Sequence, residues 1–91
     1  MTKPVTLSAH ARERAAQRGA TEEQIAATLA TGRWEPADRG RRQASQTFAF
    51  DAEWQGRLYR RQQVRVVFAE EPDSLVVVTV FVYYFDEEGM G

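Results

Sequence analysis

The chain has 91 residues and no cysteine, and its formal net charge is −1. A chain of this length buries roughly two-thirds of its unfolded surface, which is enough for one core and excludes a second domain. The absence of cysteine excludes disulfide bonds, thiolate zinc sites and a cysteine nucleophile, and it fits a reducing compartment. We therefore expect a single cytoplasmic domain over residues 1–91.

The net charge is the sum of two parts of opposite sign. Residues 1–65 hold all 12 basic residues and 7 acidic ones, so this part carries +5. Residues 66–91 hold 6 acidic residues and no basic one, so this part carries −6. Of the 12 basic residues, 11 are arginine, the residue best suited to planar recognition of phosphate. This distribution predicts that an anion binds on the side formed by the first part of the chain.

The first part of the chain is predicted to form two short helices. Ser8 is a favourable N-cap and Gly19 a favourable left-handed end, so the first helix is expected over about residues 9–18. The sequence Thr-Glu-Glu-Gln at residues 21–24 is a capping box, which predicts that a second helix starts there. This second helix is expected over about residues 21–31.

The second part of the chain is predicted to form an antiparallel sheet. Alternating, Val-rich and aromatic-rich segments predict four strands, at about residues 45–50, 57–61, 64–69 and 75–84. Residues 5–7 are a candidate for a fifth strand. The last predicted strand is apolar on both faces, which is typical of a central strand covered on both sides, or on one side and by a partner. Helices followed by strands predict an α+β fold, with two helices packed on a four- or five-stranded antiparallel sheet.

One stripe of the first helix combines a histidine with two arginines. His10, Arg14 and Arg18 are four residues apart and therefore lie on one face of the helix. Like charges at this spacing repel each other by roughly 0.2–0.5 kcal/mol on an isolated helix. A phosphate lying across the stripe would remove this repulsion, because arginine binds phosphate through two parallel hydrogen bonds. The stripe is thus a candidate anion site, with His10 as a candidate proton-transfer group.

The stripe also has a purely structural interpretation. In that alternative His10 and the two arginines are surface residues, paired with Glu22 or Glu23 of the second helix. Arg12 lies among the alanines of the opposite face and is the candidate for a buried, paired arginine.

The connection after the second helix combines four arginines with an aromatic ring. Its candidate RNA-binding residues are Arg33, Trp34, Arg39, Arg41 and Arg42. Arginines in such a segment would follow phosphates while the indole stacks on a base. The alternative is a solvated connection with the indole in the core.

The helix stripe belongs to a longer motif. The segment 7–14 reads Leu-Ser-Ala-His-Ala-Arg-Glu-Arg, and Gln17-Arg18-Gly19 and a capped helix follow it. These residues resemble a bacterial family called domain of unknown function 4258, whose signature is similar to S-x-H-x-x-x-R-x-x-x-R-G with a late strand V-V-T-V-Y. The late strand here reads Val-Val-Thr-Val-Phe at residues 77–81, so Phe81 stands where the resemblance implies a tyrosine.

This family is similar in layout to the RelE/ParE-like toxins. Those toxins place two helices against an antiparallel sheet and cleave RNA without a metal ion. The resemblance therefore implies a RelE-like fold and a ribonuclease or toxin-related role for this chain. It also implies an antitoxin or immunity protein as a partner.

Two functions are open at this point. The first is a metal-independent endoribonuclease, in which His10 transfers a proton at the 2′-hydroxyl or the leaving oxygen and the two arginines of the stripe hold the phosphate. Tyr83 is the candidate for the second proton transfer, with Tyr84 and Glu13 as alternatives. The second function is a non-catalytic module that binds RNA or another protein, including a second copy of the chain.

Metal and membrane binding are not expected. The chain has one histidine and no cysteine, and its carboxylates show no metal-binding spacing, so we expect no metal or other cofactor. The longest apolar stretch, residues 75–85, is too short to cross a bilayer as a helix.

Overall fold

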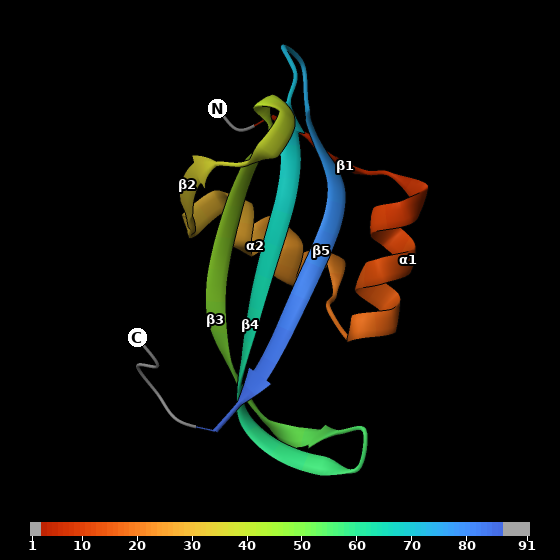
Figure 1. Ribbon diagram of the computed structural model, residues 1–91, viewed down its shortest axis with the longest axis vertical. Helices are drawn as coiled ribbons and strands as arrows, with labels where there is room; N and C mark the ends of the chain where they lie inside the picture. The colour runs from red at the N-terminus through yellow and green to blue at the C-terminus, as the bar shows by residue number, and fades with distance from the viewer. Residues whose placement is uncertain (1–2, 87–91) are drawn as a thin grey trace.

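Two helices and a five-stranded sheet make up the fold in residues 3–86, the part of the chain described by this computed structural model (Figure 1). In chain order the elements are β1 (Val5–Leu7), α1 (Ala9–Arg18), α2 (Glu22–Thr31), β2 (Arg33–Pro36), the 3-10 turn η1 (Asp38–Gly40), β3 (Arg42–Trp54), β4 (Arg57–Glu70) and β5 (Leu75–Phe85). The α+β class is therefore confirmed.

Both helices begin, and α1 also ends, through the caps that the sequence predicts. The Ser8 hydroxyl accepts a hydrogen bond from the Ala11 amide at 3.0 Å, and Gly19 ends α1 with a φ of 83°. Thr21 and Gln24 form the capping box, each accepting from the other residue's backbone N–H at 3.0 Å. Local hydrogen bonds of this kind depend on neighbouring residues alone, which is why the sequence predicts both helices.

The sheet is mixed, so the expectation of a fully antiparallel sheet is wrong. The strand order is β1-β5-β4-β3-β2, in which β1 is parallel to β5 and the other neighbours are antiparallel. A hairpin turn forces antiparallel pairing, whereas β1 and β5 are joined through the rest of the molecule and are free to pair in parallel. The candidate strand at residues 5–7 is confirmed as β1.

Strand boundaries also differ from the prediction. The two strands expected at 57–61 and 64–69 form one strand, β4, and the strand expected at 45–50 extends over the whole of β3. A pair of glutamines separates the two expected segments, but Gln62 is buried and its amide bonds to Gly19 O at 3.1 Å. The strand continues because a long-range partner satisfies this polar side chain.

A further strand, β2, lies where the sequence predicts only an Arg-rich connection. It pairs with the start of β3, from Arg33 opposite Ser45 to Pro36 opposite Arg42. The two strands are joined by a turn in which Arg39 and Gly40 have φ values of 62° and 73°. Two consecutive left-handed residues are the geometry of a tight hairpin. Arginine rarely adopts a left-handed backbone, so the sequence does not predict this turn.

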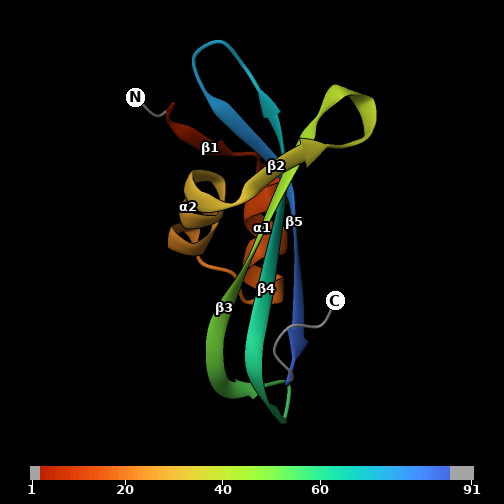
Figure 2. The same cartoon turned by 90° about the vertical axis from the view of Figure 1, so that its left-hand side faces the viewer.

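The helices cover one face of the sheet and leave the other uncovered. Figures 1 and 2 show α2 across one face and α1 alongside β5, while the β2–β3 connection bends toward the opposite face. The buried core lies on the helix side and includes Ala11, Ala15, Ile25, Leu29, Val64, Val66, Phe68, Val77 and Val80. Within residues 3–86, no helix is long and apolar enough to cross a membrane.

The uncovered side, called the open face below, is formed by alternate residues of the strands. On β4 these are Arg61, Gln63, Arg65 and Val67, and their partners on β5 are Phe85, Tyr83, Phe81 and Thr79. Phe81 is 37% exposed and Tyr83 is 43% exposed. β5 is therefore covered on one face only in the described chain. The interpretation of β5 as a strand covered on both sides by its own chain is wrong, because its alternate apolar residues face solvent.

Candidate functional site

The three residues of the predicted stripe line one hollow beside the open face. This space, called the α1 hollow below, has a volume of about 520 Å³ and opens to solvent. It is lined by His10, Arg14, Arg18, Arg41, Val67, Val78, Thr79 and Phe81. None of these lining residues, all within residues 3–86, is acidic, so three guanidinium groups and one imidazole line the same space without a carboxylate. The α1 hollow is thus electrostatically suited to an anion.

Arg18 is held in place by β5. Its Nη1 donates to the Val80 carbonyl oxygen at 2.6 Å, and its Cζ lies 5.1 Å from the centroid of the Phe81 ring. The carbonyl is accessible because β1 pairs only with the first three residues of β5, so the following edge of β5 faces α1. A guanidinium has several N–H donors, and this bond leaves others for a ligand. The side chain is therefore both fixed and able to bind an anion.

Arg14 and His10 complete the stripe without an acidic partner. Arg14 is half-buried and its Nη1 donates to Gln17 Oε1 at 3.2 Å, while His10 is exposed in the first turn of α1. Among the described residues, the ion pair that α1 makes belongs to Arg12, whose Nη1 lies 2.8 Å from Glu22 Oε2. The pairing of the stripe with Glu22, which the structural alternative includes, is therefore not observed among the described residues, because Glu22 pairs with Arg12.

Arg12 itself differs from its prediction. It is paired, as expected, but its side chain is 63% exposed rather than buried. The alanines beside it, Ala11 and Ala15, make the buried contact with the sheet. The long arginine side chain extends past them into solvent, where its charge stays hydrated.

The end of α1 is anchored by a partly buried polar cluster. The Tyr84 hydroxyl donates to the Arg18 carbonyl oxygen at 2.6 Å and accepts from Gln62 Nε2 at 3.2 Å. Gln62 Oε1 in turn accepts from Gln24 Nε2 of α2 at 2.7 Å. Burial raises the pKa of Tyr84, partly offset by the hydrogen bond from Gln62. Tyr84 therefore positions α1 from the helix side of the sheet and is not available as a proton-transfer group in the α1 hollow.

Tyr83 lies on the open face but outside the lining of the α1 hollow. It is opposite Gln63 in the sheet, and the Arg65 Cζ lies 5.3 Å from its ring centroid. Phe81, two residues earlier on the same strand, occupies the position next to the stripe. The structure thus brings together His10, Arg14 and Arg18, and leaves Tyr83 as a neighbour of the site.

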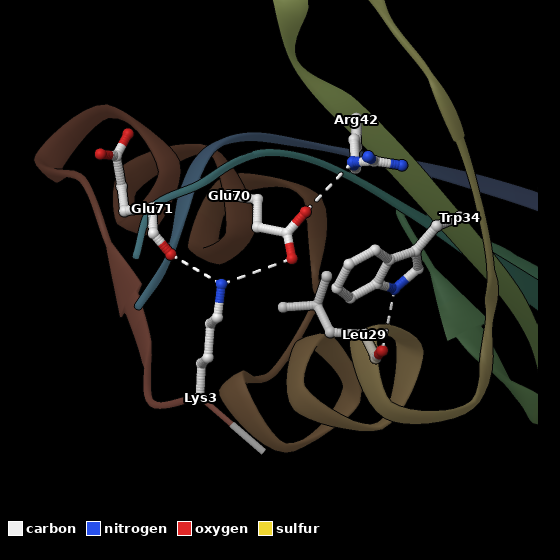
Figure 3. Close-up of polar contacts among 6 residues, drawn as sticks. All are labelled: Lys3, Leu29, Trp34, Arg42, Glu70 and Glu71. Carbon is white, nitrogen blue, oxygen red and sulfur yellow. Dashed lines mark hydrogen bonds and ion pairs between the residues drawn. The ribbon is translucent and has the colours of Figure 1, made fainter. Parts of the chain in front are cut away.

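The Arg-rich connection contributes one residue to the α1 hollow, which is Arg41. Arg33 is exposed on the edge strand β2, and Arg39 is exposed in the turn that follows. Arg42 points to the helix side, where its Nε lies 3.3 Å from Glu70 Oε1, and Glu70 Oε2 lies 3.4 Å from Lys3 Nζ (Figure 3). The predicted arginines of this segment are therefore divided between different surfaces.

Trp34 belongs to the core side of the sheet. Its Nε1 donates to the Leu29 carbonyl oxygen at 3.1 Å (Figure 3), and its ring packs edge-to-face on Phe68 with centroids 4.9 Å apart. Of the two alternatives for this residue, packing in the core is the one that the structure shows.

Two residues beside the site were missed by the sequence reasoning, namely Phe81 as a lining residue and Arg65 as its neighbour across the sheet. The alternation of β4 indicates the position of Arg65, because burial of Val64 and Val66 on one face places Arg65 on the opposite face. Which face is open depends on where the helices pack, which the alternation does not reveal.

The described residues hold no group of three or more His, Cys, Asp or Glu side chains that could bind a metal ion. What the α1 hollow offers chemically is arginine side chains for an anion and one imidazole for proton transfer.

The comparison with protein families matches one family over residues 7–82, described as a domain of unknown function (DUF4258). No curated protein and no solved structure matches the chain. The matched range includes both helices, β2, β3, β4 and most of β5, so it contains every residue that lines the α1 hollow. The chain therefore belongs to the family described as the domain of unknown function DUF4258.

Proposed function

We propose that this protein binds RNA, and that Arg14, Arg18 and Arg41 hold its phosphates in the α1 hollow. The observation that carries the proposal is the meeting of three guanidinium groups from two separate segments in one hollow without an acidic lining residue. By contrast, Arg12 on the opposite side of α1 is paired with the Glu22 carboxylate. A bound phosphate would neutralise the α1 hollow and accept charge-assisted hydrogen bonds from it.

RNA is favoured over a small anion by the surroundings of the α1 hollow. Phe81 lines it, and the open face continues beyond it with further aromatic and basic side chains. Phosphate contacts next to exposed rings are typical of proteins that bind nucleic-acid strands. The resemblance to a bacterial family similar in layout to RelE/ParE-like toxins supports the same ligand class, and a cytoplasmic location would expose the protein to RNA.

Measurements of RNA affinity against salt concentration test this proposal. We expect Arg14→Ala and Arg41→Ala each to weaken binding of a labelled RNA and to lower the slope of log K against log[salt] by about one. Arg12→Ala is the matched control, since it removes the same charge from the opposite side of α1. Equal losses in Arg12→Ala and Arg14→Ala would mean that binding follows net charge and would contradict a site in the α1 hollow.

A metal-independent endoribonuclease is the second candidate, favoured by the position of the single histidine among the guanidinium groups. In this reaction His10 takes the proton of a 2′-hydroxyl, the 2′-oxygen bonds to phosphorus, and the bond to the 5′-oxygen breaks as that oxygen takes a proton. Among the described lining residues, His10 carries the one imidazole, and none of the others is a carboxylate or a tyrosine. The leaving oxygen would depend on Tyr83 or solvent, so binding is the first proposal and cleavage the second.

Incubation of RNA with the purified protein in EDTA separates the two candidates. Cleavage that is lost in His10→Gln and kept in Arg12→Ala would identify an endoribonuclease. Intact RNA together with retained binding would identify a non-catalytic module. A toxin-related role would further predict an antitoxin or immunity protein that covers the open face, and self-association is the other partner hypothesis.

A further inference from the structure

A second feature of the open face extends from the α1 hollow and consists of two aromatic rings on β5. Phe81 and Tyr83 are the exposed large aromatic side chains in the described chain, and they are two residues apart on one strand. Aromatic rings on an uncovered sheet face lose hydrophobic stabilisation unless a ligand covers them. Their exposure therefore favours a planar ligand that covers them.

Each of these rings is accompanied by a guanidinium group. The Cζ of Arg18 lies 5.1 Å from the Phe81 centroid, and the Cζ of Arg65 lies 5.3 Å from the Tyr83 centroid. Nucleobases stack both on aromatic rings and on guanidinium planes. Two such arginine–ring pairs therefore form two adjacent stacking positions, and the positive charge of each favours a ligand that carries phosphate.

The spacing of the two rings selects the conformation of the ligand. Residues i and i+2 of a strand are about 6.6 Å apart, twice the rise of one residue. Nucleotides in a duplex strand follow each other at about 3.4 Å along the axis, so neighbouring bases of a duplex are too close together to occupy both positions. Two successive bases reach both rings only when the strand is extended and its bases are unpaired.

The residues around the rings fit such a strand. Gln63 lies opposite Tyr83 in the sheet, and Thr47 follows it on β3, so side-chain hydrogen-bonding groups lie next to the second stacking position. Phe81 also lines the α1 hollow, which places the first stacking position beside the phosphate-binding arginines. β4 and β5 hold a single acidic residue, Glu70, and it is paired with Lys3 and Arg42 on the helix side.

We propose that the ligand of the open face is single-stranded RNA, with two successive unpaired bases stacked at Phe81 and Tyr83. The strand follows β5, and the phosphate next to the base at Phe81 occupies the α1 hollow. This inference rests on the proposed RNA-binding function and adds the conformation of the RNA and the residues that select it. Tyr83 thereby acquires a role in base stacking.

Binding of a short single-stranded RNA, with the fluorescent base 2-aminopurine at successive positions, tests the inference. We expect Phe81→Leu and Tyr83→Leu each to weaken binding from about fivefold to about a hundredfold, the range measured for loss of one base–aromatic stack. Phe81→Tyr and Tyr83→Phe keep the rings and should bind as the wild type does. Leu58→Ala is the control for an exposed apolar side chain elsewhere, since Leu58 is 69% exposed in the β3–β4 hairpin.

The fluorescence and the form of the RNA give independent readouts. Stacking on the rings should quench 2-aminopurine in the wild type, and each Leu variant should restore the emission at one position. A duplex of the same sequence should bind at least about tenfold more weakly than the single strand. Circular dichroism of each Leu variant establishes that its fold is retained before affinity is compared.

The possible failures are distinguishable. If the wild type binds RNA and Arg14→Ala weakens binding, but both Leu variants bind normally or the duplex binds as tightly as the single strand, the stacking inference is overturned and the proposed function stands. If the wild type binds neither form of RNA, both are overturned. Loss of affinity in the Leu variants, with recovery in Phe81→Tyr and Tyr83→Phe, supports the inference.

Discussion

At the scale of single residues, Gly19 shows how one position serves both the fold and the site. Its φ of 83° is in the left-handed region, and a Cβ added there would lie 2.5 Å from the Tyr84 hydroxyl and 2.8 Å from the Trp54 ring. The glycine lets the chain end α1 and approach this aromatic cluster closely. Because Gly19 directly follows Arg18, its contact with the aromatic cluster also fixes the position of the helix stripe along β5.

Gly19→Ala should therefore be strongly destabilising. We expect Gly56→Ala, at a φ of 84° with no atom within 4 Å of the added Cβ, to cost about 1 kcal/mol of unfolding free energy from backbone strain alone. Gly19→Ala should cost about 1–3 kcal/mol more, because the added methyl group also overpacks the aromatic cluster. Urea unfolding of both variants measures the difference. Equal losses of unfolding free energy in the two variants would show that the aromatic cluster accommodates the methyl group without destabilisation.

At the scale of elements, α1 is held to β5 at both of its ends. The Ser8 amide donates to the Val77 carbonyl oxygen at 3.0 Å at the start, and the Tyr84 hydroxyl donates to the Arg18 carbonyl oxygen at 2.6 Å at the end. The stripe lies between these two attachments and is thus fixed relative to the open face. A helix attached in this way presents its arginines without a large entropy loss on binding.

Tyr84→Phe tests the second attachment. Removing the hydroxyl leaves a part-buried carbonyl and the Gln62 amide without this partner, so we expect a loss of about 1–3 kcal/mol. Tyr83→Phe, which changes an exposed ring on the opposite face, should stay within about 0.5 kcal/mol of the wild type. Urea unfolding at neutral pH compares the two variants, and similar values for both would argue against the attachment.

Tyr84→Phe should also change how the free energy of unfolding depends on pH in the alkaline range. Because burial raises the pKa of Tyr84 above 10.0, the unfolded chain loses this proton at a lower pH than the folded protein does. The contribution of Tyr84 is therefore complete below pH 10.0 and declines as the pH rises from there through the folded-state pKa. The stability difference between the wild type and Tyr84→Phe should shrink across this range in urea titrations. A constant difference would contradict the raised pKa.

At the scale of the whole molecule, the opposite charges of the two parts of the sequence partly cancel in space. Glu70 is paired with Lys3 and Arg42, and Asp86 is paired with Arg57, with distances of 3.3–3.4 Å. The arginines of the α1 hollow have no such acidic neighbour among its lining residues within residues 3–86. A net charge near zero thus coexists with a locally positive surface. The position of the charges on the surface, rather than the total charge, should therefore govern RNA binding.

Two variants of equal net charge test this point. Thr79→Glu places a carboxylate in the α1 hollow, and we expect it to weaken RNA binding by about tenfold or more at low salt, because the carboxylate competes with phosphate for the arginines. Ala26→Glu adds the same charge at an exposed position of α2 on the other side of the sheet and should change affinity little. Equal weakening in both would indicate that RNA responds only to total charge.

Local chemistry allowed the sequence to predict much of this architecture. The caps at Ser8 and Thr21 define both helices, and the spacing of His10, Arg14 and Arg18 places them on one stripe. The alternating, Val-rich and aromatic-rich segments of the second part identify the strands of the sheet. Each of these properties depends on residues within one or two turns or along one strand, so no tertiary contact is needed to deduce them.

The tertiary structure decided what these elements face. The parallel pairing of β1, the added strand β2 and the unbroken β4 all depend on partners that are far away in the sequence. Tyr83 and Tyr84 lie on opposite faces by strand alternation, but which of them faces the helices likewise depends on which face α1 and α2 cover. The sequence by itself determined the helices, the strand-rich second half and the His/Arg stripe. Only packing decided that the stripe borders an open face with Arg41 and Phe81, because long-range contacts choose which side of an amphipathic element is buried.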